Sequence, residues 1–285
     1  MQEKTLFCAG LGYSATALAQ LLSNDGWRVI GTVRDEAGEA RARASGAEPV
    51  PWPPRREDLA QAGNLLISPA PREDGDPTLK AVGDVIRELP WRWVGYLSTT
   101  GVYGDHKGAW VDEETSLTPA TKRGELRVKA EAEWRDTGLP IHIFRLAGIY
   151  GPGRGPFSKV RNGTARLIEK PGQVFSRTHR DDIAAILAAS LAAPNPGAYN
   201  VCDDEPAPPQ DVIAHAADLL GVPRPPLVAF EEAEMTPMAR SFYAESKRVS
   251  NRKVKDLLGR ELAFPTYREG LAALLEEERA KTASP

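Results

Sequence analysis

Short apolar runs alternate with amphipathic segments along most of the chain. The apolar runs predict strands at 5–9, 27–33, 64–68, 93–98, 140–146 and 198–202, and the amphipathic segments predict helices near 14–24, 77–88, 122–136 and 181–192. The strand runs are continuously apolar, which is typical of strands buried on both faces. The pattern therefore predicts an α/β fold with a doubly wound parallel sheet between two layers of helices.

The residue composition and the pattern of predicted elements change after residue 150. Segments 151–173 and 204–265 are richer in Gly and Pro and predict shorter helices, whereas 174–203 returns to a strand, a helix and a strand. We therefore expect a sheet domain made of 1–150 and 174–203, and a small interleaved C-terminal domain made of 151–173 and 204–285. The stretches 233–257 and 267–278 are expected to be helical cover or an interface.

Composition and charge restrict the classes of binding partner that the protein is expected to have. The chain has 285 residues, with 36 Lys and Arg against 39 Asp and Glu, and no long basic run. A net charge of −3 gives no electrostatic footprint for nucleic acid or for an anionic membrane. The uncharged apolar stretch before Pro194 is too short to span a bilayer, which takes about 20 residues. We therefore expect a cytoplasmic protein with a small-molecule substrate, and a homodimer is compatible with the sequence.

The two cysteines and four histidines do not have the spacing of a metal site. Cys8 and Cys202 lie in predicted strands, so we expect buried free thiols, in keeping with a reducing compartment. Asp181 and Asp182 precede an apolar helix, and we expect one of them to be its N-cap.

The first predicted strand ends in the sequence GLGYSA at residues 10–15, just before a helix. In this G-x-G-x-x-A pattern the first glycine permits a tight turn, the second lets the backbone approach a pyrophosphate, and the alanine allows close helix packing. Phosphates would lie at the helix N-terminus. The candidate cofactor-binding residues are Gly10, Gly12, Tyr13, Ser14 and Ala15; a purely structural turn is the alternative.

The second predicted strand ends where an adenosine ribose is contacted in such folds. Thr32 and Arg34 lie at this end, and no acid occupies the strand tip itself. Arg34 could pair with a 2′-phosphate, whereas Asp35 could accept a hydrogen bond from a free 2′-hydroxyl. We favour NADP over NAD, with solvated loop charges as the remaining alternative.

Four further strings occur in order along the chain: LSTTGVYG at 97–104, FRLAGIYGPG at 144–153, HRDDIA at 179–184 and AYNV at 198–201. Together with the glycine motif they resemble the extended short-chain dehydrogenase/reductase superfamily, and within it the NAD-dependent epimerase/dehydratase branch. The resemblance spans nearly the whole chain. It implies a Rossmann domain that binds NAD(P) and a small C-terminal domain that closes over the substrate.

The resemblance also implies roles for single residues. Thr99 matches the catalytic Ser/Thr of the family. Ser98, the residue before it, is expected to contact the cofactor. The remaining matches are Ser68, Pro69 and Ala70 in the loop that contacts the cofactor, and Leu146, Ala147 and Gly148 beside the nicotinamide.

The sequence departs from the family at its catalytic Tyr-x-x-x-Lys pair. The aligned positions hold Arg123 and Arg127, and no tyrosine occurs between residues 104 and 149. This resembles an atypical subgroup that lacks the pair. A guanidinium stays protonated and cannot act as a base. Arginines at i and i+4 share a helix face, so they could bind a carboxylate or phosphate of substrate or cofactor, or form a solvated, salt-bridged surface.

Other residues would then have to carry the proton. The nearby candidates are Tyr103, Asp105, His106, Asp112, Glu113, Glu114 and His179. We expect an NAD(P)-dependent oxidoreductase, epimerase or dehydratase that acts on a small polar or nucleotide-sugar-like substrate. The alternative is a non-catalytic NAD(P)-binding sensor or regulator.

Overall fold

The structure is a computed structural model that describes residues 4–283. Within this range seven strands form one sheet in the order β11-β7-β5-β4-β1-β2-β3, and every neighbouring pair is parallel. The predicted doubly wound parallel sheet is confirmed. Its strands are β1 (Thr5–Ala9), β2 (Arg28–Val33), β3 (Ala47–Pro51), β4 (Asn64–Ile67), β5 (Trp93–Thr99), β7 (Ile141–Leu146) and β11 (Gly197–Val201).

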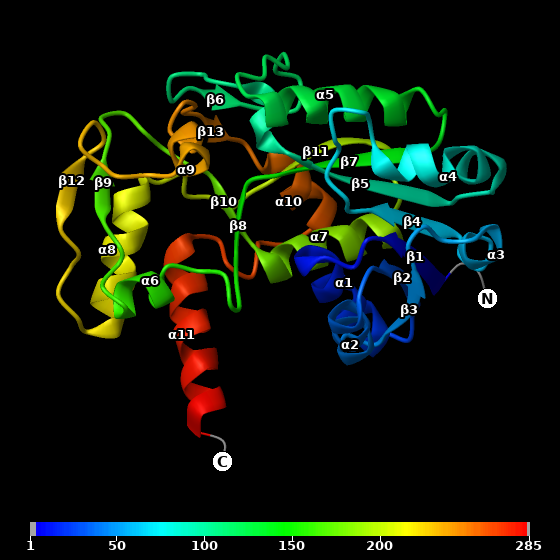
Figure 1. Cartoon of the computed structure of the whole chain (residues 1–285), viewed down its shortest axis with the longest axis horizontal. Coiled ribbons are helices and arrows are strands. Elements are labelled where there is room, and N and C mark those ends of the chain that lie inside the picture. Colours follow the sequence, from blue (N-terminus) through cyan, green and yellow to red (C-terminus); the bar gives the residue numbers. More distant parts are fainter. Residues whose placement is uncertain (1–3, 284–285) are drawn as a thin grey trace.

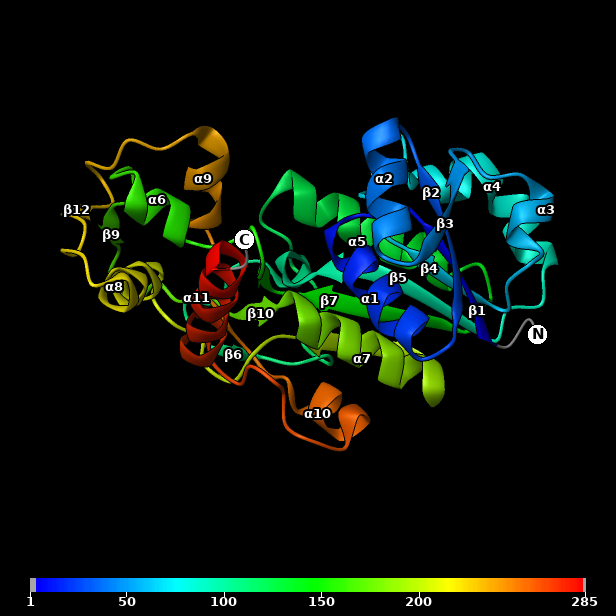
Figure 2. The same ribbon diagram turned by 90° about the horizontal axis from the view of Figure 1, so that it is seen from below.

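Helices cover both faces of the sheet (Figures 1 and 2). α1 (Tyr13–Asn24) and α7 (Arg180–Ala192) pack against one face, and α10 (Arg252–Leu258) packs on α7. The opposite face is covered by α3 (Arg56–Leu59), α4 (Pro77–Glu88) and α5 (Lys122–Arg135). α2 (Glu36–Ala44) contacts the β2 and β3 edge.

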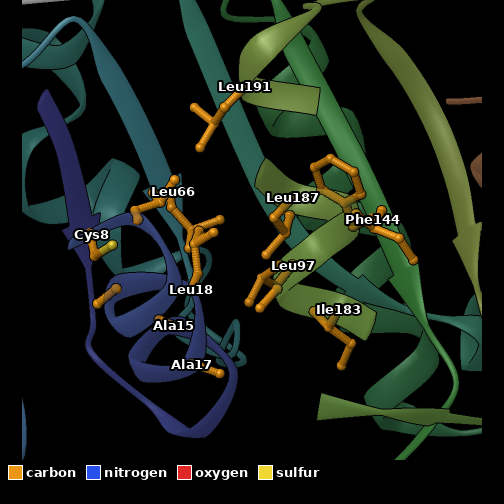
Figure 3. Packing of buried hydrophobic residues seen from close by; sticks show 14 of the residues in the cluster. Cys8, Ala15, Ala17, Leu18, Leu66, Leu97, Phe144, Ile183, Leu187 and Leu191 are labelled. Atoms are coloured by element: carbon orange, nitrogen blue, oxygen red, sulfur yellow. The ribbon is translucent and has the colours of Figure 1, made fainter. Parts of the chain in front are cut away.

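The apolar strands divide their side chains between these two layers. Leu66, Leu97 and Phe144 point toward α1 and α7, as Figure 3 shows. Their chain neighbours Leu65 and Tyr96 pack into the cluster on the other face. Because side chains alternate along a strand, a sheet covered on both sides has apolar residues at most successive positions.

The sequence pattern did not predict β3 and α2. Pro49 and Pro51 lie within β3, and proline cannot donate a ladder hydrogen bond. The strand pairs only with β2, so it is an edge strand, where proline is tolerated.

A second, smaller core lies beyond the carboxyl ends of the strands. It is built by α6 (Phe157–Arg161), α8 (Pro209–Leu220) and α11 (Tyr267–Ala283) around Tyr150 and Tyr267. Two short parallel pairs adjoin it: β8 (Gly148–Tyr150) with β10 (Arg177–His179), and β9 (Leu167–Glu169) with β12 (Leu227–Ala229). A third pair, β6 (Trp110–Val111) with β13 (Arg248–Val249), contributes Val111 and Val249 to a separate apolar cluster. The expected domain boundaries stay a prediction.

Two sequence expectations concern single segments. The stretch 233–257 is not one helix: it holds α9 (Pro237–Phe242), β13 and most of α10. Cys8 and Cys202 are buried free thiols, as expected. Between residues 4 and 283 no helix is both long and apolar enough to cross a membrane, and no group of three His, Cys, Asp or Glu side chains could hold a metal ion.

Candidate functional site

The glycine loop, residues 10–15, joins β1 to α1 at the carboxyl edge of the sheet. Gly10 has a φ of +84°, which favours glycine, and its N–H donates to Thr32 Oγ1 at 2.7 Å. Gly12 is the N-cap of α1, and within the described chain no side chain caps this end and no acid lies in its first turn. Ser14 and Ala15 are buried in that turn. The N–H groups of the turn, with the positive end of the helix dipole, form an anion-binding end.

The loop after β4 lies against the glycine loop. A Cβ on Gly10 would be 3.2 Å from Pro69 Cγ, so a side chain there would crowd this loop. A Cβ on Gly12 would lie 3.6 Å from Ser68 Oγ, an ordinary contact. Ala70 follows on the exposed side. The structure therefore brings the expected loop, 68–70, next to the glycine motif.

The end of β2 presents one free cation. Arg34 is exposed, and within residues 4–283 it forms no ion pair. Asp35 is the N-cap of α2, and its Oδ1 accepts a hydrogen bond from Gly38 N–H at 2.7 Å. The carboxylate is therefore engaged locally, whereas the guanidinium is available.

Thr99 and Leu146 are register partners at the carboxyl ends of β5 and β7. Thr99 Oγ1 accepts from Gly101 N–H at 3.2 Å and caps the 3₁₀ turn Thr100–Tyr103. Ala147 is buried, and Gly148 is exposed at the start of β8. These residues form the floor of the site beside the glycine loop's end of the sheet.

A buried polar network lies beneath this floor, and the sequence analysis missed it. Arg145 donates to both oxygens of Glu131, Nη2 to Oε2 at 2.9 Å and Nε to Oε1 at 3.2 Å. Ser98 Oγ donates to the same carboxylate at 2.6 Å, and Tyr103 bridges Arg145 to Asn200. The sequence does hold one signal for this network, because Arg145 lies inside an otherwise apolar strand. A buried charge requires a partner, so this residue indicates that a polar partner lies nearby.

Arg127 is fixed at the end of β5. Its Nη1 donates to Leu97 O at 2.6 Å and to Tyr96 Oη at 3.0 Å, and the guanidinium stacks over the Tyr96 ring. It therefore holds the helix α5 to the strand that ends in Thr99.

Arg123 has a different environment one helical turn earlier. Within the described chain no carboxylate lies within 4 Å of its guanidinium, which is 5.9 Å from the Phe242 ring centroid. Burial lowers the pKa of Arg123, and Arg127 and Arg154 lower it further. A partly desolvated cation beside two others lacks a counter-charge, which a bound anion would supply.

Tyr13 connects the glycine loop to the segment after β8. Its hydroxyl donates to Pro152 O at 2.9 Å, and the guanidinium groups of Arg154 and Arg180 stack on its ring. Arg180 also pairs with Asp181 at 2.9 Å. Arg154 therefore joins Arg123 as a second arginine near the site without a carboxylate partner among residues 4–283.

Two candidate proton carriers are unsuited to the role. Tyr103 lies between Arg145 and Asn200, and burial raises its pKa to about 12. Burial lowers the pKa of His179 to about 4. His179, not Asp181 or Asp182, is the N-cap of α7, since its Nδ1 accepts from Asp181 N–H; the expectation for this cap was wrong.

Most loop carboxylates are also engaged. Asp105 accepts from the N–H groups of Lys107 and Ser246, and Glu113 accepts from Asn200 N–H at 2.7 Å. Asp112 caps its own turn through Thr115, and His106 Nε2 contacts Tyr103 O. Glu114 is exposed.

Fold and site together define an epimerase/dehydratase-like protein of the extended short-chain dehydrogenase/reductase superfamily. No family model matches the chain. Protein YeeZ of Escherichia coli K12 is 31% identical over 219 residues, which cover 70% of this chain and 77% of that protein. The chain belongs to the family of Protein YeeZ.

Solved structures share the fold of this chain. A functionally unknown conserved protein from Silicibacter pomeroyi is 57% identical, with a TM-score of 0.91 over 96% of this chain and 99% of that one. UDP-glucuronic acid 4-epimerase from Bacillus cereus, solved in complex with NAD, is 16% identical and has a TM-score of 0.76 over 97% of this chain and 99% of that one. The second likeness concerns the fold alone.

Proposed function

We propose that the protein binds a nicotinamide dinucleotide along the carboxyl edge of the sheet and acts as an oxidoreductase, epimerase or dehydratase on a small polar or nucleotide-sugar-like substrate with an anionic group. The observation that carries the proposal is the pairing of two anion-seeking features. One is the uncapped N-terminus of α1 at Gly12, and the other is Arg123 without a carboxylate partner within residues 4–283.

The residues present fit the cofactor. The N–H groups of Tyr13 and Ser14 would hold the pyrophosphate, because Gly12 leaves the backbone accessible and Pro69 closes the loop from behind. Arg34, exposed and free of ion pairs in the described chain, supports NADP over NAD. The floor at 146–148 would lie beside the nicotinamide, which supplies a site for hydride transfer when bound.

Arg123 and Arg127 act as cations in this proposal. A guanidinium keeps its proton at neutral pH, so neither replaces the missing tyrosine as a base. Arg123 anchors the anionic group of the substrate, and Thr99 Oγ1 orients a hydroxyl or carbonyl near the floor. Arg127 keeps α5 against β5 and so positions Arg123.

A cofactor-binding sensor is the second candidate, and the proton carriers favour it. Burial raises the pKa of Tyr103 to about 12 and lowers the pKa of His179 to about 4. Both values lie outside the range that is useful for general acid–base catalysis near pH 7. Asp105 and Glu113 are held by backbone N–H groups. Such a protein would bind the dinucleotide without turning over a substrate.

Thermal stabilisation by NADP and NAD tests the proposal. We expect both to raise the melting temperature of the wild type, and Gly12→Val to abolish the shift. The variant should fold, because Gly12 has a φ of −87° and its Cβ would have only an ordinary contact with Ser68. Ala40→Val, on the exposed side of α2, is the control. No shift in the wild type would refute dinucleotide binding, and an unchanged shift in Gly12→Val would misplace the site.

Turnover separates the two candidates. A screen of nucleotide sugars and small carbonyl compounds with NADPH should reveal an activity that Thr99→Val reduces. Tight cofactor binding with no turnover across the screen would favour the sensor.

A further inference from the structure

The short helix α9 presents apolar side chains next to Arg123. None of its six residues is buried; Met238 is 72% exposed and Phe242 is 51% exposed. The Arg123 guanidinium lies 5.9 Å from the Phe242 ring centroid, so α9 and α5, which are far apart in the sequence, meet at the substrate side of the site. In Figure 1, α5 lies over the sheet and α9 lies to its left, in the smaller part of the molecule.

α9 is held in place by contacts that do not use this apolar face. Thr236 Oγ1 caps the helix by accepting from Ala239 N–H. Arg240 donates to Ala233 O at 2.8 Å and stacks on Phe230 at 4.8 Å. The face that carries Phe242 is therefore exposed except where the Arg123 guanidinium of α5 lies over the ring, while Thr236 and Arg240 anchor the helix.

The acidic side chains near Arg123 are paired with other cations, so its guanidinium can bind one anionic group of a ligand. The acid of its own helix turn, Glu125, pairs with Lys122 at 3.7 Å, and Glu131 is taken by Arg145. Arg127, one turn further along the same helix, is committed to Leu97 O. A ligand that satisfies this position needs a negative group for the guanidinium and an apolar, planar part for the aromatic ring beside it.

We propose that the substrate is a planar aromatic carboxylate: its carboxylate pairs with Arg123, its ring packs on Phe242, and Met238 covers the ring edge. This rests on the proposed function and names the substrate class of the same site. A sugar has no planar π-system to stack on Phe242, whereas an aromatic ring does. Methionine beside an aromatic ring gives favourable sulfur contacts and adapts to different ring shapes.

The experiment measures binding to the NADPH-loaded protein by isothermal titration calorimetry. The probes are benzoate, cinnamate and indole-3-acetate, each compared with its neutral amide, together with glucuronic acid and UDP-glucuronic acid. We expect at least one aromatic carboxylate to bind roughly tenfold or more tightly than its amide and than glucuronic acid, because a charge-assisted pair and ring contact are both required.

Matched variants assign the two contacts. Arg123→Gln and Phe242→Ala should each weaken the aromatic carboxylate roughly tenfold or more, whereas Phe242→Leu should weaken it less. The controls are Leu227→Ala, which removes another exposed apolar side chain, and Arg166→Gln, which removes another arginine charge outside the site. Both controls should leave binding unchanged.

The failures are distinguishable. Absence of NADPH binding by the wild type refutes the proposed function. Normal NADPH binding with no aromatic carboxylate bound, or with UDP-glucuronic acid bound more tightly and unaffected by Phe242→Ala, overturns the substrate class alone.

Discussion

The Glu131–Arg145 pair beneath the site should be worth far more to stability than a surface pair of similar geometry. Glu131 is 0% exposed and Arg145 is 3% exposed at the side chain, and two hydrogen bonds join them. Glu131→Gln keeps the volume of the side chain and an acceptor for Ser98 Oγ, but it removes the counter-charge. Arg145 then keeps only neutral partners, chiefly Tyr103 Oη at 2.8 Å.

The expected loss follows from burying an uncompensated charge. Breaking a buried ion pair by removing one partner costs about 3–5 kcal/mol. For a chain of this size each kcal/mol lowers the melting temperature by about 2 °C, so the variant should melt roughly 6–10 °C lower. Because the pair lies directly below Ser98 and the ends of β5 and β7, the variant should also bind the cofactor less well.

Glu48→Gln is the matched control. Glu48 pairs with Arg28 through two hydrogen bonds at 2.8 and 2.6 Å, but the side chains are 54% and 45% exposed. Solvent screening limits such a pair to about 0–1 kcal/mol. Urea unfolding followed by tryptophan fluorescence measures both variants, and equal losses for Glu131→Gln and Glu48→Gln would refute the reasoning.

Three further predictions concern the cofactor, the N-cap residue of α7 and Asp182 in its first turn. Arg34→Ala should erase the preference for NADP over NAD, measured by calorimetry; equal binding of both cofactors by the wild type would contradict it. Burial lowers the pKa of His179 from 6.5 to about 4, so the folded state binds fewer protons than the unfolded chain in this window. The stability is thus complete above pH 6.5 and falls as the pH drops toward 4, and His179→Asn should flatten that slope in urea titrations; identical slopes would refute it. Asp182 accepts from Ala263 and Phe264 N–H at 2.8 and 3.0 Å, so Asp182→Ala should cost about 1–3 kcal/mol in the same assay, and a loss below 0.5 kcal/mol would disagree.

The sequence predicted the sheet because its physical requirement is local. A strand covered on both faces is apolar at most successive positions, and β1 and β5 show this directly. β3 has the composition of a loop, with two prolines in five residues. Only its place at the sheet edge, which depends on pairing with β2, allows it to be a strand.

The candidate site also contains features that are encoded locally and features that depend on distant contacts. The glycine loop is readable because its turn and helix start are encoded within six residues. The contact of Arg123 with Phe242 joins segments more than a hundred residues apart, and no local pattern specifies it. The Arg145–Glu131 pair is also a long-range contact, although a charge within an apolar strand indicates that some partner exists.

The resemblance to the extended short-chain dehydrogenase/reductase superfamily predicts a tyrosine where this chain has Arg123, and under the proposed function this difference changes what the site can do to a substrate. A tyrosine hydroxyl can give and take a proton, whereas a guanidinium can only donate hydrogen bonds. Under the proposed function we therefore expect Arg123 to bind a charge rather than to move a proton, and an anionic substrate group would be held beside it. Chemistry at this site must then need little proton transfer, or take its proton from solvent or from the substrate itself. If Arg123→Ala lowers the turnover rate at saturating substrate without changing the affinity for that substrate, Arg123 has a role in the reaction beyond anchoring, and this reasoning is wrong.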